Sequence, residues 1–581
     1  MKKTITKLTA LIVVACSLFT GNIAHAQKVE WNATNFPDPT LREMLKTSGY
    51  VKQGTNESAL YVETDEVKEL DYNTVVGNVD GGVRDLKGLE LLTELTSLRV
   101  CCENIDITLS NPKLQSLDIW LHGTVNRFSL NLPSLESLDI SDEPETKMVE
   151  TIDLSKESRL KKMTVNSYNM RYLDLSALTN LEEADIRVTS SVTGIDHLSK
   201  LKSLSLTDCS GMTTLTLSEL PNLRYFDIME ASNLSELDVS KAVNLQGIEF
   251  NYCDALKSLN LKNNKKLESV NCAFHDKSGN LSSLTLPDSV KYLSCDNNKI
   301  SSLTLPKGLV ILTCGNNNFK TLDLSKMSKL ETLYAQGNDL QKVNISGCKK
   351  LKYVDLSDNS KLTAVDVSKN KKLYDLKLTK TGLKKLDVSK NPKLAILEVA
   401  NTKLKTLDVG KNAELVTLDV ANTQLKQLNT KKNTKLVSLV IDHTKISTLD
   451  LSNNKKLSSL SIDHSKIRTL DLSNNKKLDT LSLGSQIKKL DLTKYKFKSN
   501  IISLLLNGKR GKKLALKNYI GTGCTIYEDP DDDTTPIKSK ELKYNKKSGS
   551  VTISKTAKKK ETYWLPLKKG KKVYVIGVTV K

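Results

Sequence analysis

The sequence predicts a β-rich solenoid, a rod of short stacked coils, because of its length and a repeat of 21 residues. The chain has 581 residues, of which 38% are apolar, whereas a single globular core stops growing near roughly 250 to 300 residues. LxxLxL units recur at alternating steps of 10 and 11 residues, so two strand-like units make one coil. Such a coil cannot cover its own apolar face, and stacked neighbours complete the core.

The repeat is most regular between residues 373 and 478. One half of each coil reads LxxLDVxxN, as in residues 383–391, and the other reads LxxLxVxNT, as in residues 394–402. The apolar residues that open successive units are Leu373, Leu383, Leu394, Leu404, Leu415, Leu425, Leu436, Ile446, Leu457, Ile467 and Leu478. Weaker copies run back to Leu89, so we expect a solenoid of roughly 19 coils over residues 89–496.

The first 26 residues have the pattern of an export signal. A basic start precedes the apolar run 8–19, and Ala24-His25-Ala26 is the small-x-small pattern that signal peptidase cuts. We therefore expect a signal peptide over residues 1–26 and a secreted or cell-surface protein. Residues 13–16 also match a lipoprotein processing box, which would make Cys16 a lipid-bearing N-terminus. No later stretch approaches the roughly 20 apolar residues of a transmembrane helix.

Residues 27–88 precede the repeats and are expected to cap them. Asp38 is placed as a helix N-cap, Pro39 follows at the first helical position, and Gly49 is a stop signal. These residues predict a short helix. A cap is needed because the first coil would otherwise expose its leucines.

Polar residues recur with the same 21-residue period and are expected to be structural. An asparagine at a turn bonds backbone groups that the bend leaves unpaired. This asparagine column consists of Asn370, Asn391, Asn412, Asn433, Asn454 and Asn475, and a second column of Thr402, Thr423, Thr444 and Ser465 lies in the other half. The Asp of each LDV unit lies between two inward apolar residues, so its side chain should point outward.

These features resemble the bacterial leucine-rich repeat family, most closely internalin-like surface proteins with short repeats. The repeat spacing carries the resemblance, together with the block Asn35–Arg42 (NFPDPTLR), which looks like the N-terminal cap of that family. The resemblance implies a right-handed leucine-rich repeat rod. It also implies recognition or adhesion, with a protein or glycan of a cell surface as the partner, and no catalysis.

Nine cysteines follow the expected signal peptide, and most of them occupy core positions. Cys272, Cys295 and Cys314 take the last apolar position of LxxLxL-type units, whereas Cys209, Cys253 and Cys348 replace the turn asparagine. We expect free, buried thiols, with disulfide bridges as the alternative in an exported protein. No C-x-x-C pair supports a zinc site.

The charge is divided along the chain. Residues 27–300 carry 28 basic and 41 acidic side chains, whereas residues 301–500 carry 37 and 18. Cations recur in register along the repeats, and columns of this kind attract anionic partners such as acidic glycans. The alternative interpretation is a solvated face that keeps the repeat soluble. The basic columns comprise Lys384, Lys405, Lys426, Arg468 and Lys489 in one row and Lys372, Lys393, Lys435, Lys456 and Lys477 in the other.

Three further segments are expected after the repeats. Residues 497–526 form a C-terminal cap, in which Ser499–Leu506 is predicted to be a closing helix that ends near Gly508. Residues 527–536 (YEDPDDDTTP) form an acidic linker. Residues 537–581 form a small basic β module or an anchoring tail, with strands at residues 540–545, 550–554 and 573–580.

The sequence offers little support for catalysis. No histidine lies in a metalloprotease helix or beside a nucleophile elbow. His443 and His464 lie 21 residues apart, so adjacent coils should bring them close enough to share a metal. Because Asn401 and Asn422 precede them in the same column, an ordinary turn substitution is preferred. We therefore expect no cofactor and no metal.

Two functions from different classes agree with these observations. The first is an exported, non-enzymatic recognition or adhesion protein that binds a protein or glycan through the repeat surface, with the basic half contacting an anionic partner. The second is a structural protein that assembles head to tail through its acidic and basic halves. We expect no nucleic-acid partner, because the chain is expected to be exported and has only 5% aromatic residues. The oligomeric state stays open.

Overall fold

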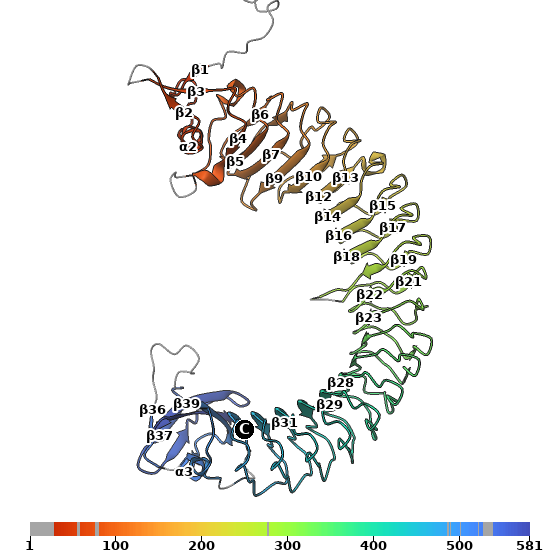
Figure 1. Cartoon of the computed structure of the whole chain (residues 1–581), viewed down its shortest axis with the longest axis vertical. Coiled ribbons are helices and arrows are strands. Elements are labelled where there is room, and N and C mark those ends of the chain that lie inside the picture. The colour runs from red at the N-terminus through yellow and green to blue at the C-terminus, as the bar shows by residue number, and fades with distance from the viewer. Residues whose placement is uncertain are drawn as a thin grey trace, which may run out of the picture. The chain divides into compact units, whose positions relative to one another are not determined.

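The computed structural model describes residues 28–54, 59–75, 81–275, 278–484, 487, 490–499, 501–520, 522–526 and 539–580. The expected signal peptide with Cys16, the acidic linker 527–536 and Lys489 lie outside these residues. The chain divides into two compact units, an N-terminal unit up to Asn233 and a C-terminal unit from Leu234. Each is a β-solenoid of stacked coils, as predicted (Figure 1). Among the described residues, no helix is long and apolar enough to cross a membrane.

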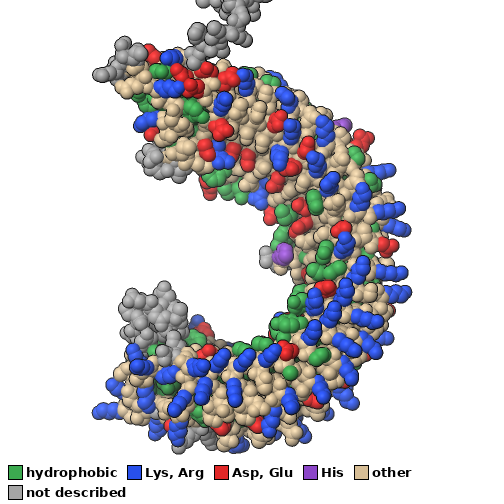
Figure 2. All heavy atoms as spheres, viewed as in Figure 1, with side chains coloured by type: hydrophobic (Ala, Val, Ile, Leu, Met, Phe, Trp, Pro, Cys, Tyr) green, Lys and Arg blue, Asp and Glu red, His purple; other side chains and the backbone are tan. Residues whose placement is uncertain are grey.

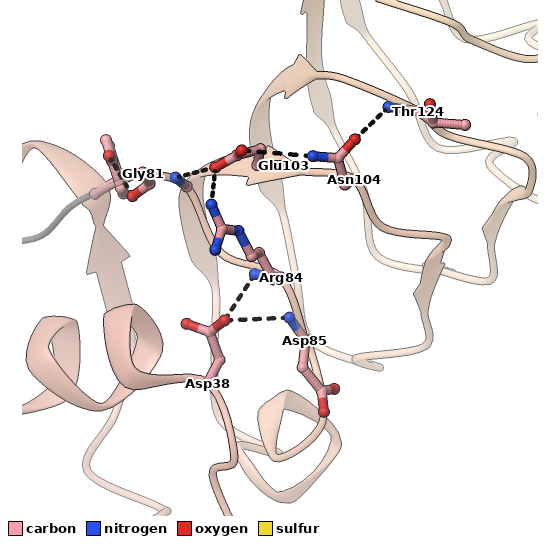
Figure 3. A network of polar contacts seen from close by, with 9 residues as sticks. Asp38, Gly81, Arg84, Asp85, Glu103, Asn104 and Thr124 are labelled. Atoms are coloured by element: carbon pink, nitrogen blue, oxygen red, sulfur yellow. Dashed lines mark hydrogen bonds and ion pairs between the residues drawn. The ribbon is translucent and has the colours of Figure 1, made fainter.

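The N-terminal unit begins with the predicted helix, α2 (Pro39–Thr47), which is confirmed. Oδ1 of Asp38 accepts the N–H of Leu41 at 2.9 Å, Pro39 starts the helix, and Gly49 follows it with a φ of 80°. Oδ2 of the same carboxylate accepts the N–H of Arg84 at 2.7 Å (Figure 3). One side chain thus caps the helix and ties it to the start of the repeats. Beside it, β3 (Leu60–Glu63) pairs antiparallel with β1 (Lys28–Glu30) and β2 (Val51–Gln53).

The repeats of the N-terminal unit form a parallel sheet with one strand per coil. Its strands are β4 (Glu69–Asp71), β5 (Ser97–Glu103), β7 (Ser116–His122), β9 (Ser137–Asp142), β10 (Lys162–Asn166), β12 (Glu183–Arg187), β14 (Ser203–Thr207) and β16 (Tyr225–Met229). Short strands form the other half of several coils: β6 (Ile107–Leu109), β8 (Phe128–Leu130), β11 (Tyr172–Asp174), β13 (Ser191–Thr193) and β15 (Thr214–Thr216). The described residues of this unit also contain the 3₁₀ turns η2 (Tyr72–Thr74), η3 (Leu89–Leu91) and η4 (Ile195–His197).

The C-terminal unit continues the same construction, and its parallel strands lie on the inner side of its curve (Figure 1). They are β18 (Gly247–Asn251), β20 (Ser269–Asn271), β22 (Tyr292–Ser294), β23 (Ile311–Thr313), β25 (Thr332–Tyr334), β27 (Tyr353–Asp355), β28 (Asp375–Lys377), β29 (Ile396–Glu398), β30 (Thr417–Asp419), β31 (Ser438–Val440), β32 (Ser459–Ser461) and β33 (Thr480–Ser482). The other half contains β17 (Glu236–Asp238), β19 (Ser258–Asn260), β21 (Ser283–Thr285), β24 (Thr321–Asp323) and β26 (Lys342–Asn344).

The expectation of two strand-like units in every coil is wrong for the most regular repeats. Between residues 363 and 484, all of them described, only the LxxLxV half forms a strand. In the LDV half the Asp side chain accepts a hydrogen bond from the backbone two residues later. For example, Oδ1 of Asp387 accepts the N–H of Ser389 at 2.8 Å. The same turn also ends β24, where Oδ1 of Asp323 accepts the N–H of Ser325 at 3.1 Å, so the turn alone does not decide whether the half forms a strand. The carboxylate of Asp387 points outward as expected, and hydrogen bonds from Ser389 lower its pKa.

The asparagine column is buried and links each coil to the one before it. Nδ2 of Asn391 donates to the carbonyl oxygens of Val367 at 3.0 Å and Asn370 at 2.9 Å. In the other half, Oγ1 of Thr402 donates to the carbonyl of Val399 at 2.8 Å. The same bonds recur along the asparagine column and at Thr423 and Thr444, so these side chains satisfy backbone groups that lie inside the turns.

All nine cysteines of the described residues are free and buried. Burial raises the pKa of Cys272, Cys295 and Cys314, which keeps these thiols protonated. Sγ of Cys348, at a turn-asparagine position, lies 3.2 Å from the carbonyl oxygen of Leu324 and donates to it. A thiol can therefore fill the asparagine position with a weaker donor.

The predicted closing helix over Ser499–Leu506 is wrong: this segment is β34 (Ile501–Gly508). Ile502, Leu504 and Leu506 alternate inward and are buried. The strand pairs in parallel with β33 on one side and with β40 (Lys572–Val580) on the other. Pairing on both sides satisfies the backbone and favours the extended form over a helix.

The last part of the chain shares sheets with the segment that was expected to cap the repeats. The predicted strands correspond to β37 (Leu542–Asn545), β38 (Ser550–Ile553) and β40, and β39 (Thr562–Lys569) was missed. β38 pairs with β35 (Lys513–Leu514), and β39 pairs with β36 (Thr525–Ile526) and β40. Two short elements, η5 (Leu492–Lys494) and α3 (Lys517–Ile520), complete this end.

Candidate binding surface on the parallel sheet

The sheet of the C-terminal unit exposes large apolar side chains on adjacent strands. They lie on β22, β23, β25 and β27 and just before β28, and Figure 2 shows hydrophobic side chains gathered on this inner side. Their exposed fractions run from 36% for Ile311 to 46% for Tyr374. We call this set the tyrosine patch: Tyr292, Ile311, Tyr334, Tyr353 and Tyr374. In the N-terminal unit, Trp120 on β7 and Tyr225 on β16 are exposed on the corresponding sheet.

The register of the sheet makes the four patch side chains within strands, those of β22, β23, β25 and β27, point outward. Each strand buries its middle residue, as Leu293 does in β22 and Val354 in β27, so the residues on either side face solvent. Tyr292 lies directly opposite Ile311 on the next strand. The rings of Tyr353 and Tyr374 meet edge to face with centroids 6.1 Å apart. The patch is therefore a rigid apolar surface on a regular scaffold, which favours binding over chance exposure.

Carboxylates continue the same surface beyond the patch. We call this set the acidic strip: Asp355, Asp375, Glu398, Asp419 and Asp442. The first four lie in β27 to β30, and Asp442 follows β31. Within strands β27 to β33 the one basic residue is Lys377, whose Nζ lies 3.8 Å from Oε1 of Glu398. The sheet face is thus acidic although residues 301–500 carry an excess of lysine.

Burial raises the pKa of three members of the acidic strip. The pKa of Asp375 rises to about 6, and those of Asp419 and Asp442 also rise. Oδ1 of Asp375 is buried and has no hydrogen-bond partner among the described residues. A carboxylate that is poorly solvated in this way gains from a cationic group brought by a partner.

Replacing Asp375 with asparagine is expected to stabilise the protein at pH 7.5 but not at pH 4. The folded-state pKa of Asp375 is above the ordinary value of about 3.9, so the unfolded chain ionises first. The free energy of unfolding therefore falls as the pH rises from about 4 to about 6, and the loss is complete above pH 6. The variant has no carboxylate at this position, so at pH 7.5 its free energy of unfolding should exceed that of the unmodified chain by about 1 kcal/mol, as expected for a half-exposed group. Urea unfolding at both pH values measures the difference.

Asp387 provides the matched control, because its pKa is shifted in the opposite direction. Its carboxylate is stabilised by hydrogen bonds from Ser389, so Asp387→Asn should give no stabilisation at pH 7.5. Equal stabilisation by both substitutions would mean that the burial of Asp375 is not the cause.

The predicted basic columns lie outside the strands of this sheet. Lys372, Lys393, Lys435, Lys456 and Lys477 are exposed and each lies three residues before a strand. Lys384, Lys405, Lys426 and Arg468 are also exposed, and they lie in the half of the coil without a strand. There Lys405 and Lys426 line a shallow depression of about 800 Å³ together with Asp387 and Asp408. Glu414, which interrupts one row, lies 2.6 Å from Nζ of Lys435.

The tyrosine patch was not identified from the sequence, although a signal for it was present. Aromatic residues make up only 5% of the chain, yet tyrosines recur at outward strand positions of successive repeats, as at Tyr334 and Tyr353. The acidic strip was missed because the charge was summed over segments of the chain and not over the faces of a coil.

His443 and His464 are brought together as expected. Their rings stack with centroids 4.2 Å apart and an interplanar angle of 6°. Among the described residues, one group of three side chains lies close enough together that it could hold a metal ion, and it comprises this pair and Asp463.

Comparison with known proteins supports the fold. No protein-family model matches the chain, and no curated protein sequence matches it. YopM from Yersinia enterocolitica is similar in structure, with a TM-score of 0.50 and 19% identity over 83% of this chain and 99% of that chain. The functional domain of InlJ from Listeria monocytogenes, described as including a cysteine ladder, gives a TM-score of 0.49 and 18% identity over 96% of this chain and all of that one. The resemblance to bacterial leucine-rich repeat proteins is confirmed at the level of the fold.

Proposed function

We propose that this chain is an exported, non-enzymatic recognition or adhesion protein that binds a protein partner through the sheet of its C-terminal unit. The tyrosine patch is the observation that carries this proposal. Tyrosines supply a large contact area at low entropic cost and are enriched among the residues that dominate binding energies. A fold made of regular coils presents an extended open sheet, which suits a large partner such as a protein.

The charge around the patch defines the partner further. The acidic strip borders the tyrosines, so the partner should present apolar side chains flanked by lysine or arginine. A cation near Asp375 would relieve the desolvation that raises the pKa of this carboxyl group. Export is supported by the signal-peptide pattern of residues 1–26.

The combined substitution Tyr353→Ser and Tyr374→Ser is expected to weaken partner binding by about 1,000-fold, because central aromatic residues each contribute about 2 kcal/mol when truncated and two such losses sum to about 4 kcal/mol. The partner is first selected by screening the full chain on arrays of surface proteins and glycans, and affinities are then measured by surface plasmon resonance. Both side chains are exposed, so the far-UV circular dichroism spectrum should not change.

The control variant carries Lys384→Gln, Lys405→Gln and Lys426→Gln, which lie outside the strands. It should bind the partner with unchanged affinity. Loss of binding in this variant, with full binding in the tyrosine variant, would overturn the proposal and favour the basic columns as the site for an anionic glycan.

A structural role through self-association is the second candidate. The acidic strip and the basic columns occupy different parts of the same coils, so one copy could place its lysines on the strip of another. Such contacts are screened by salt. Concentration-dependent assembly in low salt that dissolves at high salt, measured by sedimentation velocity, would favour this role; a monomer in both buffers favours recognition.

A further inference from the structure

Two Asp-His pairs occur at the same turn of successive coils, after β31 and β32. The equivalent residues of the two preceding coils are Ala400-Asn401 and Ala421-Asn422, and they become Asp442-His443 and Asp463-His464. All four second residues have positive φ, between 53° and 58°. Asparagine adopts this conformation readily, so the turn itself does not require histidine. Nor does it explain why an aspartate replaces the alanine in both coils.

The structure orients one of these histidines through a carboxylate. Oδ2 of Asp463 lies 2.7 Å from Nδ1 of His464. The backbone N–H of Asp463 donates to Oδ1 of Asp442 at 2.6 Å, and the N–H of His443 donates to the carbonyl oxygen of Asp463 at 2.7 Å. Backbone contacts therefore hold both coils in register at this point. Oδ1 of Asp463 is buried and has no hydrogen-bond partner among the described residues.

We propose that His443, His464 and Asp463 bind a divalent transition-metal ion of the zinc, copper or nickel class. One ligand atom from each residue lies within 4.8 Å of the others, and imidazole with carboxylate is a donor set that such ions prefer. Nitrogens on a tetrahedral ion lie about 3.3 Å apart, for bonds of about 2.0 Å. The two exposed rings reach this separation by rotating out of their parallel stack, and water completes the coordination.

Titration of the full chain with Zn²⁺ and with Cu²⁺, followed by calorimetry, tests the proposal. His443→Asn and His464→Asn restore the asparagine that this chain itself uses at the same turn, so the fold should be retained. Each is expected to weaken binding by about 10-fold to 100-fold, and the double variant should lose this site. Electron paramagnetic resonance of the Cu²⁺-loaded chain should show nitrogen ligands that disappear in the double variant.

His197→Asn is the control, since His197 also has a neighbouring carboxylate, Asp196 at 3.9 Å, but no second histidine of the described residues stacks on it. This variant should bind both ions like the unmodified chain. Equal affinity in the unmodified chain and in the double variant would overturn the proposal, whatever other groups then hold the ion. Loss of the nitrogen signal in the His197→Asn variant, with the signal kept in the double variant, would also overturn the proposal.

Discussion

Replacing Asn433 with alanine is expected to lower the free energy of unfolding by about 3 kcal/mol. Nδ2 of this buried side chain donates to the carbonyl oxygens of Val409 at 3.0 Å and Asn412 at 2.8 Å, both on the preceding coil. Alanine leaves two buried acceptors without a donor, and each such group costs about 1 to 3 kcal/mol. Denaturant unfolding measures the loss, and faster hydrogen exchange in the two adjacent coils should locate it.

Two further substitutions separate this effect from a general sensitivity of the turns. Asn433→Cys should cost less than alanine, because Cys348 occupies an equivalent turn and donates to the carbonyl of Leu324. Asn453→Ala removes an exposed side chain whose Nδ2 donates to the carbonyl oxygen of Lys431 at 3.1 Å, and should change stability by no more than about 0.5 kcal/mol. A loss at Asn453 as large as at Asn433 would contradict the assignment of the asparagine column as a buried link between coils.

The sequence was sufficient for features that repeat or that depend on local chemistry. The 21-residue period places Leu397, Leu418 and Leu439 in register, and the structure stacks them opposite one another. The helix that starts at Pro39 follows from its N-cap, which acts within one turn. Such features need no knowledge of distant contacts, and for that reason they were predicted correctly.

Features that depend on distant or lateral neighbours were not predictable. The run IISLLL fits a buried helix or a buried strand equally well. Its pairing with β33 and with β40, which lies about seventy residues later, decides between them. The face on which a charge lies depends on which half of the coil forms the strand. The net charge of residues 301–500 therefore gave no warning that the sheet carries Asp375 and Asp419, whose burial depends on adjacent strands.

Truncating the chain after residue 536 is expected to unfold its C-terminal end, which is the largest effect that we predict. β40 pairs with β34 from Val573 to Val580, and Nζ of Lys572 donates to the carbonyl oxygen of Phe497 at 2.8 Å. Removal would expose Leu504 and Leu506 of β34 and delete buried residues such as Leu565 and Ile576. Each buried leucine or isoleucine contributes about 1.5 to 3 kcal/mol, so the combined loss exceeds the stability of one end of a repeat protein.

Limited proteolysis distinguishes this outcome from the alternative of an independent module or tail. If residues 537–581 only anchor the protein, the truncated chain resists protease up to residue 526, as the full chain does. If β40 closes the sheet, cleavage moves into residues 501–526 and the truncated chain aggregates. Ile576→Ala, at a buried position opposite Leu504, should cost about 2 to 5 kcal/mol in the full chain. Lys546→Ala, in an exposed turn between β37 and β38, should leave the free energy of unfolding nearly unchanged. The loss of stability in Ile576→Ala would then come from the sheet contact and not from the basic composition of this segment.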